Sequence, residues 1–233
     1  MLLSPIGEEK FERLCQLLRL KQGARVLDIA CGKGEFLVRL AEVYGISGVG
    51  VDISPRLIKK CLEKKVRRVP DSDIQFMEMD GSRYVPESYE SFDLAMCIGA
   101  SFVYGGYRGT IHALKKMTKP EGLMAIGEPY WLKEPCEEYL RAEGYRREQF
   151  ETHYGNVKMG EEEGLTCIYT LVSSQDDWDN YAWLGWWDVY DYARDNPDSP
   201  DVPKLLESVK WKESYLHWGR DTLGWAIYLF RKP

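Results

Sequence analysis

The chain has 233 residues, a hydrophobic fraction of 44% and a net charge of −6 at neutral pH. A chain of this length can bury one sizeable core, and its acidic balance gives no field that would gather polyanions such as nucleic acids. No apolar run approaches the roughly 18 to 20 residues that a membrane span needs, and Glu8 and Glu9 interrupt any signal-peptide pattern. The six cysteines lack metal-binding spacing, which predicts reduced residues of a cytoplasmic protein and no metal site.

A short apolar run followed by small residues is the most informative local pattern. Residues 26–29 suit a buried parallel strand, and residues 30–34 allow a turn that brings backbone N–H groups to a ligand at a helix N-terminus. Residues 50–53 are typical of a second strand, whose carboxylate at Asp52 can accept two hydrogen bonds from a ribose diol. The two strands together predict a nucleotide-type cofactor site.

The glycine spacing separates two kinds of nucleotide site. The dinucleotide fingerprint G-x-G-x-x-G needs a third Gly, but the corresponding position after Gly32 is Leu37. The pattern is instead an acidic residue, Asp28, followed at alternate positions by Ala30, Gly32 and Gly34. A carboxylate inside the strand is unfavourable to a pyrophosphate and well suited to an amino group.

This pattern resembles the first motif of the class I S-adenosylmethionine-dependent methyltransferases, in which an acidic residue precedes alternating glycines. Ala30 stands where that motif has its first Gly. The resemblance continues in order through a third strand, a fourth strand, a helix, a Pro-Gly turn and a fifth strand, at residues 74–81, 92–99, 110–117, 119–122 and 123–128.

The resemblance implies S-adenosyl-L-methionine as cofactor and S-adenosyl-L-homocysteine as product. In the family the acidic residue that closes the third strand, Asp80 here, meets the adenine amino group. The cofactor contacts that the resemblance implies lie at or just after the ends of the first four strands: Asp28, Ala30, Cys31, Gly32, Gly34, Asp52, Ile53, Asp80, Gly81 and Cys97.

The carboxy-terminal half differs in composition, since all eight Trp and ten of the fifteen Tyr lie from residue 130 onward. A helix is predicted over residues 137–142, and a mobile loop or short helical insertion over 144–163. Residues 165–172 and 225–230 are predicted as strands six and seven, and in the family the last strand is antiparallel.

Between these two strands the family usually places one helix, but this chain has a much longer segment. A helix is predicted to start at residues 174–177, to break at 197–203 and to be followed by a second helix over 202–218. Trp183 and Trp187 point away from the main aromatic face of the first helix. They are interpreted as substrate contacts in a helical cap over about residues 176–220, and the alternative is that the second helix buries them.

The loops after strands four and five are expected to hold the substrate, because α/β sheets bind ligands at the carboxyl ends of their strands. Pro129 is expected to end strand five and leave Glu128 at the pocket mouth, where it orients the substrate or accepts its proton; the alternative is that Glu128 caps a helix or pairs with an Arg. The candidates are Glu128 and Tyr130 for catalysis, and Tyr104, Tyr107 and Trp131 for substrate contact.

Motifs of nucleic-acid methyltransferases are missing. Residues 97–102 read Cys-Ile-Gly-Ala-Ser-Phe, not the Asn/Asp-Pro-Pro-Tyr/Phe of base-amino methyltransferases. No acidic residue ends this strand, as it would in ribose 2′-hydroxyl methyltransferases. Nucleic-acid substrates are therefore not expected.

We expect one α/β domain over residues 1–233, with a cofactor-binding half at 1–130 and a carboxy-terminal half at 131–233. Its core would be a Rossmann-like seven-stranded, mostly parallel sheet with helices on both faces. The expected function is methyl transfer to a heteroatom of a small molecule, by a cytoplasmic monomer or homodimer without a membrane partner. A protein methyltransferase and a non-catalytic S-adenosylmethionine-binding sensor remain open alternatives.

Overall fold

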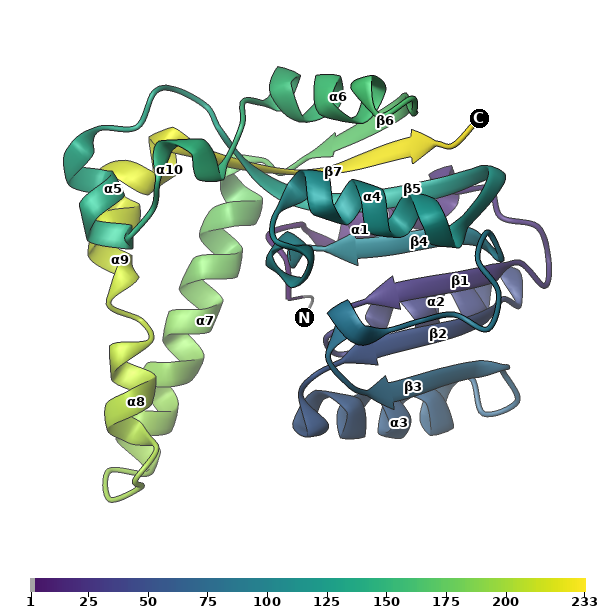
Figure 1. Cartoon of the computed structure of the whole chain (residues 1–233). Helices are drawn as coiled ribbons and strands as arrows, with labels where there is room; N and C mark the ends of the chain where they lie inside the picture. The colour runs from purple at the N-terminus through teal and green to yellow at the C-terminus, as the bar shows by residue number, and fades with distance from the viewer. Residues whose placement is uncertain (1–2) are drawn as a thin grey trace.

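A seven-stranded sheet in the order β3-β2-β1-β4-β5-β7-β6 forms the middle layer of the protein (Figure 1). The computed structural model describes residues 3–233. The first five strands pair in parallel, while β7 runs antiparallel to both β5 and β6, as expected for the last strand. The strands are β1 (Arg25–Ile29), β2 (Ser47–Asp52), β3 (Ile74–Glu78), β4 (Phe92–Ile98), β5 (Thr118–Trp131), β6 (Thr166–Val172) and β7 (Leu223–Arg231).

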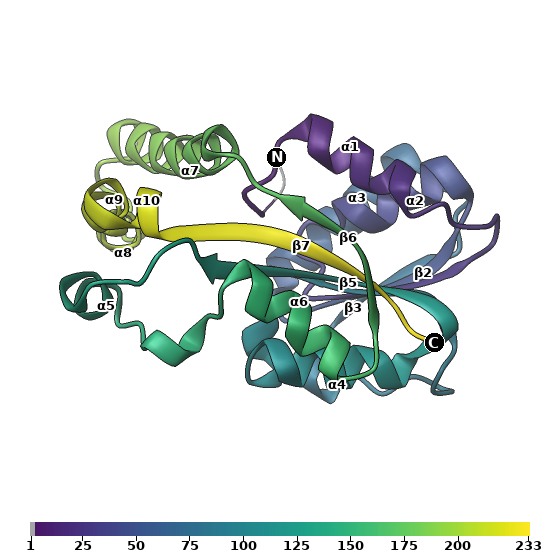
Figure 2. The same ribbon diagram turned by 90° about the horizontal axis from the view of Figure 1, so that it is seen from above.

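Helices lie on both sides of the sheet (Figure 2). One side carries α1 (Glu8–Leu17), α2 (Glu35–Tyr44), α3 (Pro55–Arg68) and α7 (Gln175–Asp195). The other side carries α4 (Tyr107–Met117), α5 (Glu137–Glu143) and α6 (His153–Glu162). The short helices α8 (Val202–Glu207), α9 (Trp211–Ser214) and α10 (Arg220–Thr222) precede β7. Among the described residues, no helix combines the length and apolar composition needed to cross a membrane.

Strand β1 shows how the sheet is buried from both sides. Val26 packs into the apolar cluster that contains residues of α1 and α2, whereas Leu27 and Ile29 pack into the cluster that contains residues of α4. Asp28 lies on the same strand and is only 2% exposed. A carboxylate inside such a strand adds nothing to the apolar core, and its presence indicates a binding role.

Strand β5 corrects the expected turn at Pro129. The strand continues to Trp131 and pairs with β7 from Leu123 to that residue, with Pro129 opposite Trp225. Strand β4 has already ended at Ile98, opposite Gly127. Pro129 therefore lies where β5 has no neighbour on that side, so its missing N–H leaves no β4 acceptor unpaired.

Two further segments of the carboxy-terminal half can be compared with expectation, and only the second differs from it. The segment expected to be a mobile loop or a short helical insertion contains the helix α6, whose N-cap Thr152 accepts a hydrogen bond from Gly155 N at 3.0 Å. Gly160 of α6 lies directly against the Phe230 ring, where no larger residue would fit, so α6 packs on β7. The expected second helix is broken into α8, α9 and a π-helical turn at Tyr215–Gly219.

Helix α7 begins where the sequence predicts. Ser174 and Asp177 form a capping box, in which each side chain accepts a hydrogen bond from the other residue's backbone N–H. The predicted aromatic face is buried: Trp186 is 1% exposed and packs on Trp211 and Tyr215. Helices α7 and α8 consequently run side by side as an arm beyond the sheet (Figure 1).

Substitution of Trp186 tests whether this arm depends on its internal aromatic core. We expect Trp186→Ala to lower the free energy of unfolding by about 3–5 kcal/mol, because it removes a fully buried indole and leaves a cavity. Trp187→Ala is the matched control, since Trp187 is 65% exposed and should change stability by about 0.5 kcal/mol or less. Urea unfolding followed by circular dichroism measures both values, and equal effects would contradict this account.

Candidate active site

A cavity of about 210 Å³, the central cavity, opens at the carboxyl ends of β1, β2 and β4. The turn after β1 forms part of its wall, and Ala30, Gly32 and Gly34 all adopt left-handed backbone angles there, with φ of 56°, 57° and 67°. For Ala30 this conformation costs roughly 1–2 kcal/mol, which the site tolerates. At Gly34 an added Cβ would lie 2.8 Å from the Phe76 ring, so the residue must be Gly for packing as well.

Asp52 joins the end of β2 to this turn. Its Oδ2 accepts a hydrogen bond from Gly32 N at 2.9 Å, and its Oδ1 accepts one from Ser54 N at 2.9 Å. The carboxylate is buried and faces the central cavity. Each oxygen retains a free lone pair, so Asp52 can still accept hydrogen bonds from a ligand.

Asp28 also lines this cavity, but no protein group forms a hydrogen bond with its carboxyl group in the described structure. Burial, with a further contribution from the charge of Asp52, raises the pKa of Asp28 to about 8. A buried carboxyl group with free acceptors is suited to a cationic donor, whose charge would favour ionisation. The central cavity therefore fits a ligand with an ammonium group near β1 and hydroxyl groups near β2.

Comparison with known proteins agrees with this geometry. A methyltransferase domain family matches residues 26–122. The uncharacterized protein YjhP of Escherichia coli K12 is 30% identical over 228 residues, which cover 97% of this chain and 91% of YjhP. A crystal structure of an S-adenosylmethionine-dependent methyltransferase from Geobacter sulfurreducens, in complex with S-adenosyl-L-homocysteine, matches with a TM-score of 0.92 at 28% identity, covering 100% of this chain and 94% of the other.

The chain belongs to the class I S-adenosylmethionine-dependent methyltransferases. A methyltransferase from Thiobacillus denitrificans, also in complex with S-adenosyl-L-homocysteine, is similar to it with a TM-score of 0.90 at 28% identity, over 100% of this chain and 94% of that one. S-adenosylmethionine is accordingly the cofactor of this methyltransferase, and Asp28 and Asp52 fit its amino group and its ribose.

Half of the expected cofactor residues line the central cavity of the methyltransferase, namely Asp28, Ala30, Cys31, Gly32 and Asp52. Sequence reasoning missed Leu3, Ser4 and Phe102, which also line it. Leu3 and Ser4 come from a segment before α1 that has no motif of its own, so no sequence signal could have identified them.

The other expected cofactor residues lie outside this lining. Ile53 is 71% exposed, and Cys97 is fully buried on the α4 side of β4, where burial raises its pKa far above the usual range. Asp80 caps a short helical turn, Gly81–Arg83, by accepting a hydrogen bond from Ser82 N at 2.9 Å. Gly81 is buried in that turn, and Gly34 packs against Phe76 behind the cavity wall.

A second cavity, of about 570 Å³, lies between the carboxyl end of β5 and the start of α4. We call it the Glu128 cavity, after the buried carboxylate in its lining. It shares Gly99 and Phe102 with the central cavity, so the two adjoin at the end of β4. This is the edge of the sheet at which α/β proteins bind their ligands.

Glu128 is 3% exposed, and its Oε2 has no hydrogen-bond partner among the described residues. Burial raises its pKa to about 7, and a hydrogen bond from Ser101 partly offsets that rise. It forms no ion pair within residues 3–233, so the alternative of a structural pair with an Arg is not what the described structure contains. A carboxyl group with a pKa of about 7 is suited to accept a proton from a substrate near neutral pH.

Among the remaining candidates from the β4 and β5 loops, Tyr107 lines the Glu128 cavity. The Tyr104 hydroxyl donates to Gly81 O at 3.1 Å and supports the loop after β3 instead. Tyr130 is buried beside His153, with ring centroids 5.1 Å apart. Trp131 is also buried, and its Nε1 donates to a backbone carbonyl at 2.9 Å. Tyr104, Tyr130 and Trp131 therefore have structural contacts in place of a position in either cavity's lining.

The two tryptophans expected to contact substrate lie outside the linings of both cavities. Lys212 Nζ lies 4.5 Å from the centroid of the Trp183 ring, so the residues after α8 partly cover that side chain. Trp187 is largely exposed, and its Nε1 donates to Asp191 at 2.7 Å. Neither residue lines the central cavity or the Glu128 cavity, and this placement corrects the expectation that the cap uses them for substrate.

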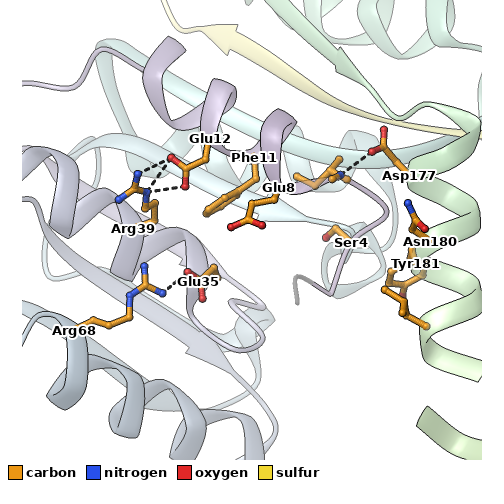
Figure 3. A pocket seen from close by; sticks show the side chains of 13 residues that line it. Ser4, Glu8, Phe11, Glu12, Glu35, Arg39, Arg68, Asp177, Asn180 and Tyr181 are labelled. Carbon is orange, nitrogen blue, oxygen red and sulfur yellow. Dashed lines mark hydrogen bonds and ion pairs between the residues drawn. The ribbon is translucent and has the colours of Figure 1, made fainter. Parts of the chain in front are cut away.

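Helix α7 instead borders a groove of about 670 Å³ on the α1 side (Figure 3). Tyr181 and Leu184 of α7 line this groove, which shares Ser4 and Glu35 with the central cavity. Asp177 ties the segment before α1 to α7, because its Oδ1 accepts a hydrogen bond from Gly7 N at 2.9 Å. The amino-terminal segment thus connects the central cavity with the helical arm.

Proposed function

We propose that this methyltransferase transfers the methyl group of S-adenosylmethionine to a heteroatom of a small molecule in the Glu128 cavity. The observation that carries the proposal is the buried Glu128 carboxyl group, with an unpartnered oxygen, in a cavity that adjoins the cofactor cavity. The volume of about 570 Å³ lies within the range of sites that bind small ligands.

The S-adenosyl-L-homocysteine complexes of the two bacterial neighbours support the identity of the cofactor, and Asp28 and Asp52 in the lining of the central cavity support its place there. When bound, it supplies an electrophilic methyl group on a positively charged sulfur. Asp28 would hold the amino group and Asp52 the ribose hydroxyls, while Asp80, which follows β3 outside the lining of the central cavity, is proposed for the adenine amino group.

The protein's contribution to the reaction is mainly positioning. The two cavities meet at Gly99 and Phe102, so an acceptor beside Glu128 lies next to the cofactor cavity. Holding two reactants in contact and excluding water are the main sources of acceleration for such a transfer. Glu128 orients the acceptor and takes its proton.

Macromolecular substrates are less well supported. The acceptor site is a cavity and not an extended surface, and the net charge of −6 opposes binding of nucleic acid. We therefore propose a small-molecule substrate and no nucleic-acid partner.

Label transfer tests this proposal. The purified enzyme is incubated with methyl-labelled S-adenosylmethionine and three fractions of a bacterial extract: small molecules, proteins and RNA. We expect label to enter the small-molecule fraction in an enzyme-dependent manner. Label confined to protein or RNA would refute the small-molecule assignment. No label in any fraction, from a protein that still binds S-adenosyl-L-homocysteine, would favour the non-catalytic sensor.

A further inference from the structure

Two oxygens in the Glu128 cavity lack hydrogen-bond partners among the described residues. They are Glu128 Oε2 and the hydroxyl oxygen of Tyr107, and both residues line the cavity. Burial, together with neighbouring Tyr228 and the charge of Glu128, raises the pKa of Tyr107 well above its usual value. Buried polar atoms are rarely left unpaired in native proteins, and two such atoms on residues that line one cavity indicate that a ligand completes them.

The surrounding side chains explain why the protein itself does not satisfy these atoms. The nearby Tyr228 hydroxyl is already engaged, at 3.1 Å from both Asn156 Nδ2 and His153 Nδ1. The Tyr107 ring packs edge-on against the Tyr228 ring, with centroids 5.6 Å apart, at the first turn of α4. Glu128 is held in the β5–β7 ladder opposite Ala226, whose small side chain offers no polar group.

We propose that a hydroxyl group of the acceptor binds between Glu128 and Tyr107, so that the enzyme methylates oxygen. This inference rests on the proposed function and specifies its substrate class as alcohols or phenols. A hydroxyl has one hydrogen and two lone pairs. It donates its hydrogen to Glu128 Oε2, accepts a hydrogen bond from Tyr107 with one lone pair, and keeps the other for the methyl carbon.

The same count of hydrogens and lone pairs disfavours other acceptor groups. A neutral amine has one lone pair, which must face the methyl carbon, so it cannot also accept the Tyr107 hydrogen; it could donate a second hydrogen to the Tyr107 oxygen, but the buried Tyr107 hydrogen would then stay unpaired. An ammonium has no lone pair at all. A carboxylate has no hydrogen for Glu128 and would place a second negative charge beside it. Among oxygen and nitrogen acceptors, only a hydroxyl pairs with both Glu128 Oε2 and the Tyr107 hydrogen and remains nucleophilic; a thiol has the same inventory but is a weak donor and a weak acceptor.

Each electron pair and the acceptor's proton have a defined destination in this reaction step. The acceptor oxygen gives a lone pair to the methyl carbon, and the carbon–sulfur bond breaks with its electron pair going to sulfur. The acceptor proton moves to Glu128 Oε2, which releases it to water after the product leaves. The Tyr107 hydroxyl stays protonated and keeps the acceptor oxygen aimed at the cofactor cavity.

Access to the pair requires the loop between β4 and α4 to shift, because both oxygens are covered in the described structure. That loop carries Phe102, which is 78% exposed at the junction of the two cavities. Gly105 and Gly106 follow it with φ of 75° and 116°, and open space surrounds both. The loop therefore has both the exposed side chain and the backbone freedom that such a movement needs.

The position of the methyl group in the product tests the inference. The methylated compound from the labelled small-molecule fraction is purified, and mass spectrometry with NMR locates the new methyl group. An O-methyl product is expected. An N- or S-methyl product would overturn the hydroxyl inference but leave the proposed function intact, whereas a C-methyl product would also overturn the proposed transfer to a heteroatom. Label found only in protein or RNA would overturn both.

Tyr107→Phe provides the second readout, measured on the compound so identified. We expect kcat to fall about 10- to 100-fold, with unchanged affinity for S-adenosyl-L-homocysteine and an unchanged or higher Tm, since the variant removes an unpaired buried hydroxyl. The loss caused by Glu128→Gln should be smaller in the Tyr107→Phe background, because both residues act on one oxygen. Tyr89→Phe, at a residue 56% exposed, is the matched control. Wild-type turnover in Tyr107→Phe, or fully additive losses, would overturn the role of the pair.

Discussion

Asp28→Asn is expected to remove most of the enzyme's affinity for its cofactor while leaving the ligand-free protein as stable as the wild type or more so. The substitution keeps the shape of the side chain but replaces a buried carboxyl group, which has no partner in the described structure and must ionise to bind the cofactor's ammonium group, with an amide that cannot ionise. In the wild type, S-adenosyl-L-homocysteine at a hundredfold excess over Kd should stabilise the fold by about 2.7 kcal/mol, or roughly 5 to 10 °C in Tm. In Asp28→Asn most of that shift should disappear.

The raised pKa of Asp28 also sets a pH dependence with a definite sign. The folded protein holds a proton up to about pH 8, whereas the unfolded chain releases it near 3.8, so this group's contribution to stability is fully present below pH 3.8 and lost as pH rises through 8. Binding of a cationic amino group should ionise Asp28 and release close to one proton at pH 7. Calorimetric titration in buffers of different ionisation enthalpy measures that proton. A wild-type Tm shift in Asp28→Asn, or no proton release, would contradict this role.

Asp52→Ala serves as the contrasting variant for that experiment. Asp52 accepts hydrogen bonds from the backbone N–H groups of Gly32 and Ser54, and each donor left unpaired costs about 1–3 kcal/mol. Asp52→Ala should therefore lose cofactor affinity and fold stability together. Only Asp28→Asn separates the two effects, because Asp28 supports no backbone group.

Glu128→Gln is expected to reduce kcat about 10²-fold on the identified substrate, the order of loss that follows removal of a general base. The Tm shift with S-adenosyl-L-homocysteine should be unchanged, since Glu128 lies outside the lining of the central cavity. Glu148→Gln is the matched control, because Glu148 lines the same cavity but is exposed. A similar loss in both variants would indicate an electrostatic effect of the cavity and not a base.

The pH profile separates a base from a purely orienting carboxylate. With a pKa of about 7, Glu128 accepts a proton only when ionised, so kcat should rise with pH through 7 and then level off. In Glu128→Gln the remaining rate should lose that dependence. A profile of identical shape in both proteins, or near-normal turnover in the variant, would leave positioning and exclusion of water as the whole mechanism.

The cofactor half of this enzyme is readable from the sequence because its signals are local. The apolar run around Asp28 and the glycines after it specify a buried strand and a tight turn within about ten residues. The start of α7 is local in the same way, since Ser174 and Asp177 complete their capping box three residues apart. The order of helices, strands and turns then indicates the parallel sheet, and the carboxyl ends of parallel strands must meet at one edge.

The acceptor site depends on contacts between segments far apart in the chain, and only the tertiary structure decides them. Tyr107 and Glu128 face one cavity because α4 begins beside the end of β5, and Tyr228 from β7 occupies the space between them and α6. The covering of α7 side chains also depends on distant residues. The helical period of α7 can be read from its own sequence, but Lys212, from the later helix α9, determines how far Trp183 is covered. Periodicity specifies which residues share a face, whereas the partner of that face depends on how the chain returns to it.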